Sequence, residues 1–184
     1  MTLGEAFDSV LAGAREGAEW AWTRLYRDVA GPVLGYLQVR GAVDPEGLLG
    51  ETFLRVARSL RTFEGDERQF RSWVFVIAHR LLQDERRARR RRPEDPDPAA
   101  GADRSAADDV AAAVMERAGI ETVVRLLDTL TPEQRDVLAL RIIGGLTVSE
   151  TAEAIGKRPG AVKALQRRGL AAIRREIERT GVPL

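Results

Sequence analysis

The sequence predicts an all-α protein of two small helical domains joined by a flexible acidic linker. Apolar residues recur at three- and four-residue spacing within residues 1–92 and again within residues 118–180, while the two-residue alternation of strands is missing. Between them, residues 92–109 hold three prolines, six acidic residues and hardly any large apolar side chains. Such a segment cannot bury enough apolar surface to fold by itself. We therefore expect domains over residues 1–92 and 118–180 and a linker over residues 93–117.

Four helices are expected in the first domain. Apolar residues at helical spacing mark residues 7–18 and 25–37, a third helix fits residues 48–60, and a fourth runs from Phe70 past Leu82. Four amphipathic helices can bury their apolar faces in one shared core.

The second domain begins with two further helical stretches, over residues 120–130 and 137–142. Thr131 precedes a proline at the first helical position and a glutamine at the third, a combination typical of a helix start. Thr147 or Ser149 can cap the helix that follows.

Residues 145–168, GLTVSETAEAIGKRPGAVKALQRR, have the pattern of a helix-turn-helix. If the motif begins at Val148, Ala152 lies where two helices approach closely, and Gly156 lies at a turn that requires a positive φ angle. An ordinary helical hairpin is the alternative. The apolar residues that would face inward are Ile155, Val162 and Leu165.

Basic charge gathers in two places, although the net charge is only +1. Six of the seven residues from Arg86 to Arg92 are arginine, and residues 157–179 hold eight basic residues against two glutamates. Such runs are often only solvated surface. They are also what a protein needs to neutralise the phosphates of a nucleic acid.

The second helix of the motif would present Lys163, Arg167 and Arg168 outward, with Arg158 just before it. Arginine can bond a guanine edge through two hydrogen bonds, and lysine or arginine can neutralise phosphates. This face therefore suits the major groove of duplex DNA. A solvated basic face is the alternative, which the scarcity of acidic residues there disfavours.

Aromatic and basic residues interleave in residues 70–87, FRSWVFVIAHRLLQDERR. Bases of single-stranded DNA can stack on such rings while arginines follow the backbone. Alternatively, Phe70, Trp73 and Ile77 fill the core, because they recur at helical spacing.

Composition argues against an enzyme. The chain has no cysteine and one histidine, so thiol catalysis, disulfides, zinc sites and histidine triads lack their side chains, and we expect no cofactor and no metal. No apolar run reaches the roughly 18 residues of a membrane span. Glu5 and Asp8 interrupt the start where a signal peptide would be apolar. We expect a cytoplasmic protein without membrane insertion.

Three stretches resemble the extracytoplasmic-function (ECF) sigma factors of bacterial RNA polymerase. ETFLRVARSLRTF and FRSWVFVIAHRLLQDERRARRRR are similar to region two of that family. LLDTLTPEQRDVLALRIIGGLTVSETAEAIGKRPGAVKALQRRGLAAIRR is similar to region four. The stretches occur in the order of the family and cover nearly the whole chain.

The resemblance implies three sets of binding residues. Those expected to bind core polymerase are Leu48, Leu49, Glu51, Thr52, Phe53 and Arg55. Those expected to capture the melted −10 element are Phe63, Phe70, Arg71, Trp73, His79, Arg80, Asp84, Arg86 and Arg87. Those expected to read the −35 duplex are Arg158, Lys163, Ala164, Arg167 and Arg168.

The resemblance also implies partners and a mechanism. The chain would bind the clamp and flap regions of core RNA polymerase, and an anti-sigma factor would hold it inactive. Region four would read duplex DNA while region two traps unpaired bases, with the linker passing through the RNA path of the polymerase. Nucleotide polymerisation would belong to the core enzyme.

The sequence departs from the family pattern at two places. Gly47 and Gly50 stand where the family usually has an acidic residue and a glutamine, and His79-Arg80 replaces the common Arg-Asn pair. Weak polymerase binding would suit a sigma-like mimic that sequesters an anti-sigma factor. A conventional helix-turn-helix regulator is the other alternative, but no dimer face or ligand pocket is evident in the sequence.

Overall fold

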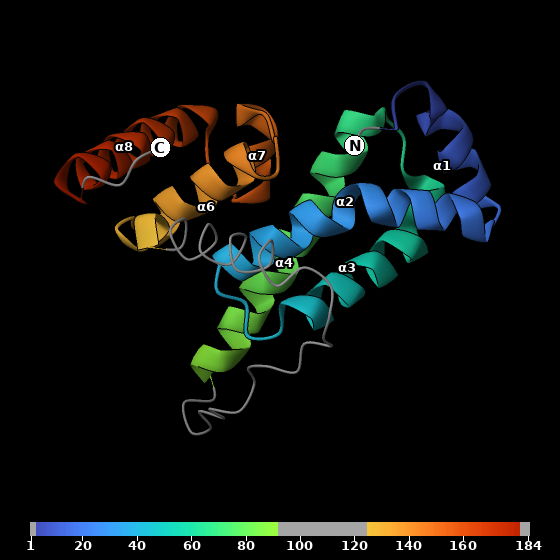
Figure 1. Ribbon diagram of the computed structural model, residues 1–184, viewed down its shortest axis with the longest axis horizontal. Helices are drawn as coiled ribbons and strands as arrows, with labels where there is room; N and C mark the ends of the chain where they lie inside the picture. Colours follow the sequence, from blue (N-terminus) through green and yellow to red (C-terminus); the bar gives the residue numbers. More distant parts are fainter. Residues whose placement is uncertain (1–2, 92–124, 181–184) are drawn as a thin grey trace.

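The chain folds into helices, as predicted, and they form two lobes (Figure 1). The computed structural model describes residues 3–91 and 125–180. The first lobe comprises η1 (Gly4–Ala6), α1 (Phe7–Arg15), α2 (Glu19–Val39), α3 (Pro45–Ser59), η2 (Leu60–Thr62) and α4 (Glu67–Arg91). The second comprises a helical stretch at residues 125–128, then α6 (Pro132–Ile142), α7 (Val148–Ala154) and α8 (Pro159–Thr180).

Within those two ranges no strand occurs, so the all-α fold class is confirmed. The predicted linker, residues 93–117, lies outside the described residues, as do Arg92 and the start of the helix expected over residues 120–130.

The four main helices of the first lobe share one core, as predicted. Val10 of α1, Leu25 of α2, Val56 of α3 and Phe75 of α4 are each fully buried in it. Burying such side chains contributes about 1.5–3 kcal/mol each, and this sum is what orders the lobe.

Local signals shift two helix boundaries from their predicted places. The helix expected to reach Ala18 ends earlier, because Gly17 adopts a φ of +84° and breaks it; Ala18 instead precedes α2. α3 begins at Pro45, three residues before the predicted start. Asp44 accounts for this, since its side chain accepts a hydrogen bond of 2.8 Å from the Gly47 N–H and so caps the helix.

Two capping boxes fix the helix starts of the second lobe. The Thr131 side chain accepts from the N–H of Gln134, whose side chain accepts from the Thr131 N–H, as expected. Thr147 and Glu150 repeat the arrangement at α7, so Thr147 rather than Ser149 is the cap. Gly156 has a φ of +66° at the turn between α7 and α8, as predicted.

The two lobes pack against each other, which the sequence did not predict. α6 lies beside α2 and α4 in Figure 1, and Ala139 and Leu140 of α6 belong to the same apolar core as α1 to α4. Gly144 lies so close to α4 that a Cβ there would come within 3.1 Å of the Phe75 ring. A second cluster joins Val39 of α2 to Leu138 of α6. The apolar core therefore runs through both lobes.

The two glycines of α3 should respond differently to alanine. Gly50 is exposed with open space around it, so Gly50→Ala should raise the free energy of unfolding by about 1 kcal/mol through helix propensity. At Gly47 a new Cβ would collide with the Asp44 carboxylate that caps the helix, and Gly47→Ala should therefore gain less or lose stability. Urea unfolding of the two variants measures this; an equal gain would contradict it.

Candidate nucleic-acid interface

The outer face of α8 is basic, and its inner face is packed. Val162 and Leu165 are buried against Val137 and Ala152, so the inward positions predicted for the helix-turn-helix are confirmed, and Ile155 packs beside them. The side chains on the outer face are Arg158, Lys163, Arg167 and Arg168, all exposed, with Ala164 half-buried between them. Within the described residues, no ion pair involves these four cations.

Contacts from α6 hold α8 in place. The Arg141 guanidinium donates to the Gln166 side chain at 3.2 Å and to the Leu146 carbonyl, which ties α8 to the loop before α7. Gly169 lets the two helices approach closely, since a Cβ there would lie 2.9 Å from the Leu138 side chain. The sequence did not predict that Arg141 and Gly169 would position α8. A glycine inside a helical pattern was the available signal for Gly169.

The aromatic residues predicted for the −10 element form a cluster at the start of α4. The rings of Phe63 and Trp73 stack with centroids 5.0 Å apart, and Phe63 meets Phe70 edge-on at 5.6 Å. Phe70 and Phe63 are buried, whereas Trp73 is half-buried. Phe70 therefore fills the core in this conformation, as the alternative interpretation anticipated, and Trp73 is the ring of the three that solvent reaches most.

His79 lies inside the molecule, 3% exposed, and shares a hydrogen bond of 2.7 Å between its Nδ1 and the Tyr36 hydroxyl. Burial lowers the pKa of His79 from about 6.5 to about 4, against the opposing effect of the Asp136 carboxylate, and the Arg40 and Arg86 charges add to the lowering. Burial likewise raises the pKa of the Tyr36 phenol. Both groups are therefore neutral near pH 7, and His79 is a packing residue of the lobe contact in this arrangement.

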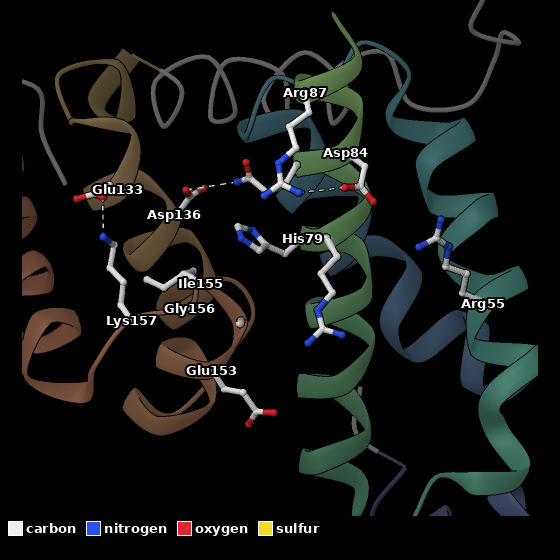
Figure 2. A pocket seen from close by; sticks show the side chains of 13 residues that line it. Arg55, His79, Asp84, Arg87, Glu133, Asp136, Glu153, Ile155, Gly156 and Lys157 are labelled. Atoms are coloured by element: carbon white, nitrogen blue, oxygen red, sulfur yellow. Dashed lines mark hydrogen bonds and ion pairs between the residues drawn. The ribbon is translucent and has the colours of Figure 1, made fainter. Parts of the chain in front are cut away.

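Other polar side chains of α4 face an open cavity of about 660 Å³ between the lobes (Figure 2). Arg80, Asp84 and Arg87 line it from α4, where Arg87 pairs with Asp84 at 3.4 Å. Lys157 lines it from the second lobe and pairs with Glu133 at 2.7 Å. The cavity is therefore strongly charged, with both signs present.

Two predicted −10 arginines are already engaged. Arg71 pairs with the buried Asp28 carboxylate at 2.7 Å. Arg86 donates to the Arg40 carbonyl and lies 4.0 Å from Asp136 of α6. Burial and the neighbouring Arg40 charge lower the pKa of Arg86.

The predicted polymerase-binding residues divide between the core and the surface of α3. Leu49 and Thr52 are buried, and the Thr52 hydroxyl donates to the Leu48 carbonyl at 2.7 Å. Arg55 is exposed and pairs with Glu51 at 3.1 Å. The side chains that are half-buried are Leu48, Glu51 and Phe53.

An exposed apolar patch beside these residues was missed. The rings of Phe53 and Tyr26 lie 4.6 Å apart, and Tyr26 and Leu54 are 45% and 54% exposed. Large exposed apolar groups on a helix pair are typical of a protein-binding surface. No periodicity pointed to Tyr26, because it lies off the apolar stripe of α2.

The structure thus combines a four-helix lobe with a helix-turn-helix lobe whose outer face is basic. Two family models match the chain: Sigma-70 region 2 over residues 21–92, and Sigma-70, region 4 over residues 120–173. The chain belongs to the ECF RNA polymerase sigma factors, as its resemblance to that family led us to expect, because SigD of Mycobacterium tuberculosis, which carries that family name, matches it over 98% of the chain and 89% of SigD.

Several curated relatives carry that family name. BldN of Streptomyces coelicolor is 34% identical over 168 residues, which cover 88% of this chain and 62% of BldN, so the chain spans less than two thirds of that relative. SigD of Mycobacterium tuberculosis is 30% identical over 196 residues, covering 98% of this chain and 89% of SigD.

Two solved structures share the fold. CnrH in complex with the cytosolic domain of CnrY has a TM-score of 0.67 at 19% identity, covering 96% of this chain and 99% of that one. The sigma factor RpoE in complex with the anti-sigma factor NepR from Bartonella quintana has a TM-score of 0.64 at 17% identity, covering 85% and 96%.

Residues 3–91 and 125–180 contain neither a candidate metal site nor a membrane-spanning helix. No cluster of three or more histidine, cysteine or acidic side chains could hold a metal ion there. No helix among those residues is long and apolar enough to cross a membrane.

The buried histidine should make stability depend on pH. Because its folded pKa is about 4 and its unfolded pKa about 6.5, the unfolded state binds more protons between these values. Stability is then fully present above pH 6.5 and should fall by about 2 kcal/mol on going to pH 5. The chain has one histidine, so the difference between wild type and His79→Asn in urea unfolding at each pH isolates the effect. Parallel pH profiles for the two proteins would contradict it.

Proposed function

We propose that this chain is a sigma factor that binds core RNA polymerase and directs transcription to specific promoters. The main support for the proposal is the exposed basic face of α8, whose cations make no ion pair among the described residues. Arg141 fixes this helix on α6, and the chain also contains sigma region two. The proposal retains the division into residues 1–92, 93–117 and 118–180. The chain itself performs no covalent chemistry and acts in the cytoplasm, where its polymerase is.

Region four reads the −35 duplex through α8. Arg167 and Arg168 reach base edges or phosphates, Lys163 and Arg158 neutralise the backbone, and the small side chain of Ala164 lets the helix approach the groove. Each good base contact contributes about 1–3 kcal/mol of discrimination. Because Arg141 and Gly169 fix α8 on α6, the helix is positioned before DNA arrives.

Region two holds the melted −10 strand along α4. The half-buried Trp73 offers a ring for stacking, supported from behind by Phe63 and Phe70. Arg80 and Arg87 follow the backbone, and Asp84 orients Arg87 through their ion pair. In this proposal Arg71 and His79 support the surface, because one is paired with Asp28 and the other is buried.

The clamp of core polymerase binds the outer face of α3. Phe53, Leu48, Glu51 and Arg55 provide its mixed apolar and charged surface, with Leu49 and Thr52 holding the helix from inside. Tyr26 extends this surface through its ring contact with Phe53. Region four contacts the flap, and an anti-sigma factor competes for these faces.

Transcription with purified components tests the proposal. The chain is mixed with sigma-free bacterial core polymerase and fragments of its own genome, and the 5′ ends of the transcripts are sequenced. We expect discrete starts that share −35 and −10 motifs. Core binding with random starts would contradict promoter recognition, and failure to bind core would favour the sigma-like mimic.

Loss of one arginine should weaken transcription from the promoters so found. Arg167→Gln removes a proposed DNA contact worth about 1–3 kcal/mol, so initiation should fall roughly 5- to 150-fold at subsaturating protein. Arg179→Gln is the matched control, because Arg179 lies in the last turn of α8 and pairs with Glu176 at 2.5 Å. Equal effects of the two changes, measured by run-off transcription, would argue against reading by this face.

A further inference from the structure

The Arg40 guanidinium is buried between the lobes with too few partners. Arg40 directly follows α2 and is 2% exposed. One of its terminal nitrogens donates to Asp136 of α6. The nearby Tyr36 hydroxyl also interacts with Arg40, which opposes the rise of the Tyr36 pKa, but the Arg40 Nε and other terminal nitrogen make no hydrogen bond of normal geometry. A buried cation in this state is costly, and removing its one carboxylate would leave it uncompensated.

Arg86 belongs to the same group. It donates to the Arg40 carbonyl, and its guanidinium lies 4.0 Å from the Asp136 carboxylate, which also receives a hydrogen bond of 3.4 Å from Gln83. Two arginines of the first lobe thus converge on one carboxylate of the second. Asp136 is half-buried at the edge of the cavity in Figure 2.

Two converging guanidinium groups are the usual means of binding a phosphate. A carboxylate can occupy the same place, because it is an anion that presents two acceptor oxygens side by side, as a phosphate does. Arg86 lies on α4 directly before Arg87, which faces the cavity together with Arg80, and it is the first residue of the arginine run of residues 86–92. The pair therefore continues a basic surface suited to a strand of DNA.

The lobe contact combines apolar packing with ion pairs. The apolar part comprises Ala139, Leu140 and Leu146 in the shared core and Leu138 against Val39. The ion pair of Arg68 with Glu150 at 3.0 Å is partly exposed, and such pairs contribute little. The buried Arg40–Asp136 pair gains attraction but loses the hydration of both ions, so the two effects largely offset each other. A contact of this kind can open.

We propose that Arg40 and Arg86 form a phosphate-binding pair of the promoter surface, and that Asp136 occupies it when the lobes are closed. This inference rests on the proposed function. It adds Arg40 to the DNA-binding residues and states that Asp136 of the second lobe covers them when the lobes are closed. Region four must leave region two before the promoter backbone reaches the pair. When the lobes are closed, the basic face of α8 is therefore accessible to DNA, whereas the Arg40–Arg86 pair is covered by Asp136.

The test uses the full chain without polymerase. The probe is a fluorescent pool of short single-stranded DNA of random sequence, and binding is followed by anisotropy over a range of salt concentrations. Asp136→Asn should open the lobes, raise affinity at least about fivefold, and steepen the slope of log K against log salt by about 0.7 for each phosphate gained. Small-angle X-ray scattering should report a larger radius of gyration.

Two comparisons identify the residues responsible. Asp128→Asn makes the same chemical change at an exposed carboxylate that pairs with Arg135 within the second lobe, and should leave binding unchanged. Adding Arg40→Gln or Arg86→Gln to Asp136→Asn should each reduce the slope by about 0.7. If Asp136→Asn and Asp128→Asn bind the DNA pool with equal affinity, the claim that Asp136 covers the arginine pair is refuted. If the lobes open and Arg40→Gln changes nothing, Arg40 is not a phosphate ligand.

A crosslink covers the case in which Asp136→Asn fails to fold. The chain has no cysteine, so the substitutions Arg68→Cys and Ser149→Cys, on facing parts of α4 and α7, allow the two helices to be joined by a flexible bismaleimide. The joined chain should bind the DNA pool more weakly, and with a shallower salt slope, than the same variant before crosslinking. Equal binding would overturn the proposal. Because no polymerase is present, this result is independent of the transcription assay, and either proposal can fail alone.

Discussion

The contact of Arg40 with Asp136 is the interaction on which the arrangement of the lobes depends. Apolar packing of α6 against α2 and α4 brings the lobes together, and the Asp136 carboxylate supplies the opposite charge for the guanidinium that this packing buries. The same contact engages Arg86 and closes one side of the cavity that the cations of α4 line. The availability of the first lobe for DNA therefore depends on the second.

The second lobe needs no such change to meet DNA. Its basic residues on α8 are exposed, and the packing of Gly169 on Leu138 fixes the helix from behind. In the proposed function, region four can read a duplex while region two is still covered. This order fits a factor that locates a promoter as duplex and captures the melted strand afterwards, because capture needs the surface that opening frees.

Much of the fold follows from periodicity. The helices, the caps at Thr131 and the turn at Gly156 are all local features, so spacing and residue type were enough to predict them. The lobe contact is not local: Arg40 and Asp136 lie 96 residues apart, and each is an ordinary charged residue by itself. Arg40 did carry one signal, since it continues the buried stripe of Val33, Tyr36 and Leu37, where a charge requires a partner. Sequence alone could not say which carboxylate would supply it, whereas the burial of Phe70 was one of the two interpretations that its helical spacing allowed.

In the proposed mechanism, one surface of region two is covered alternately by region four and by promoter DNA. The most direct measurement is the distance between spin labels at residues 68 and 149, on facing parts of α4 and α7, in the free chain and in its complex with core polymerase and promoter DNA. We expect one short distance in the free chain and one long distance in the complex. The same short distance in both states would contradict it.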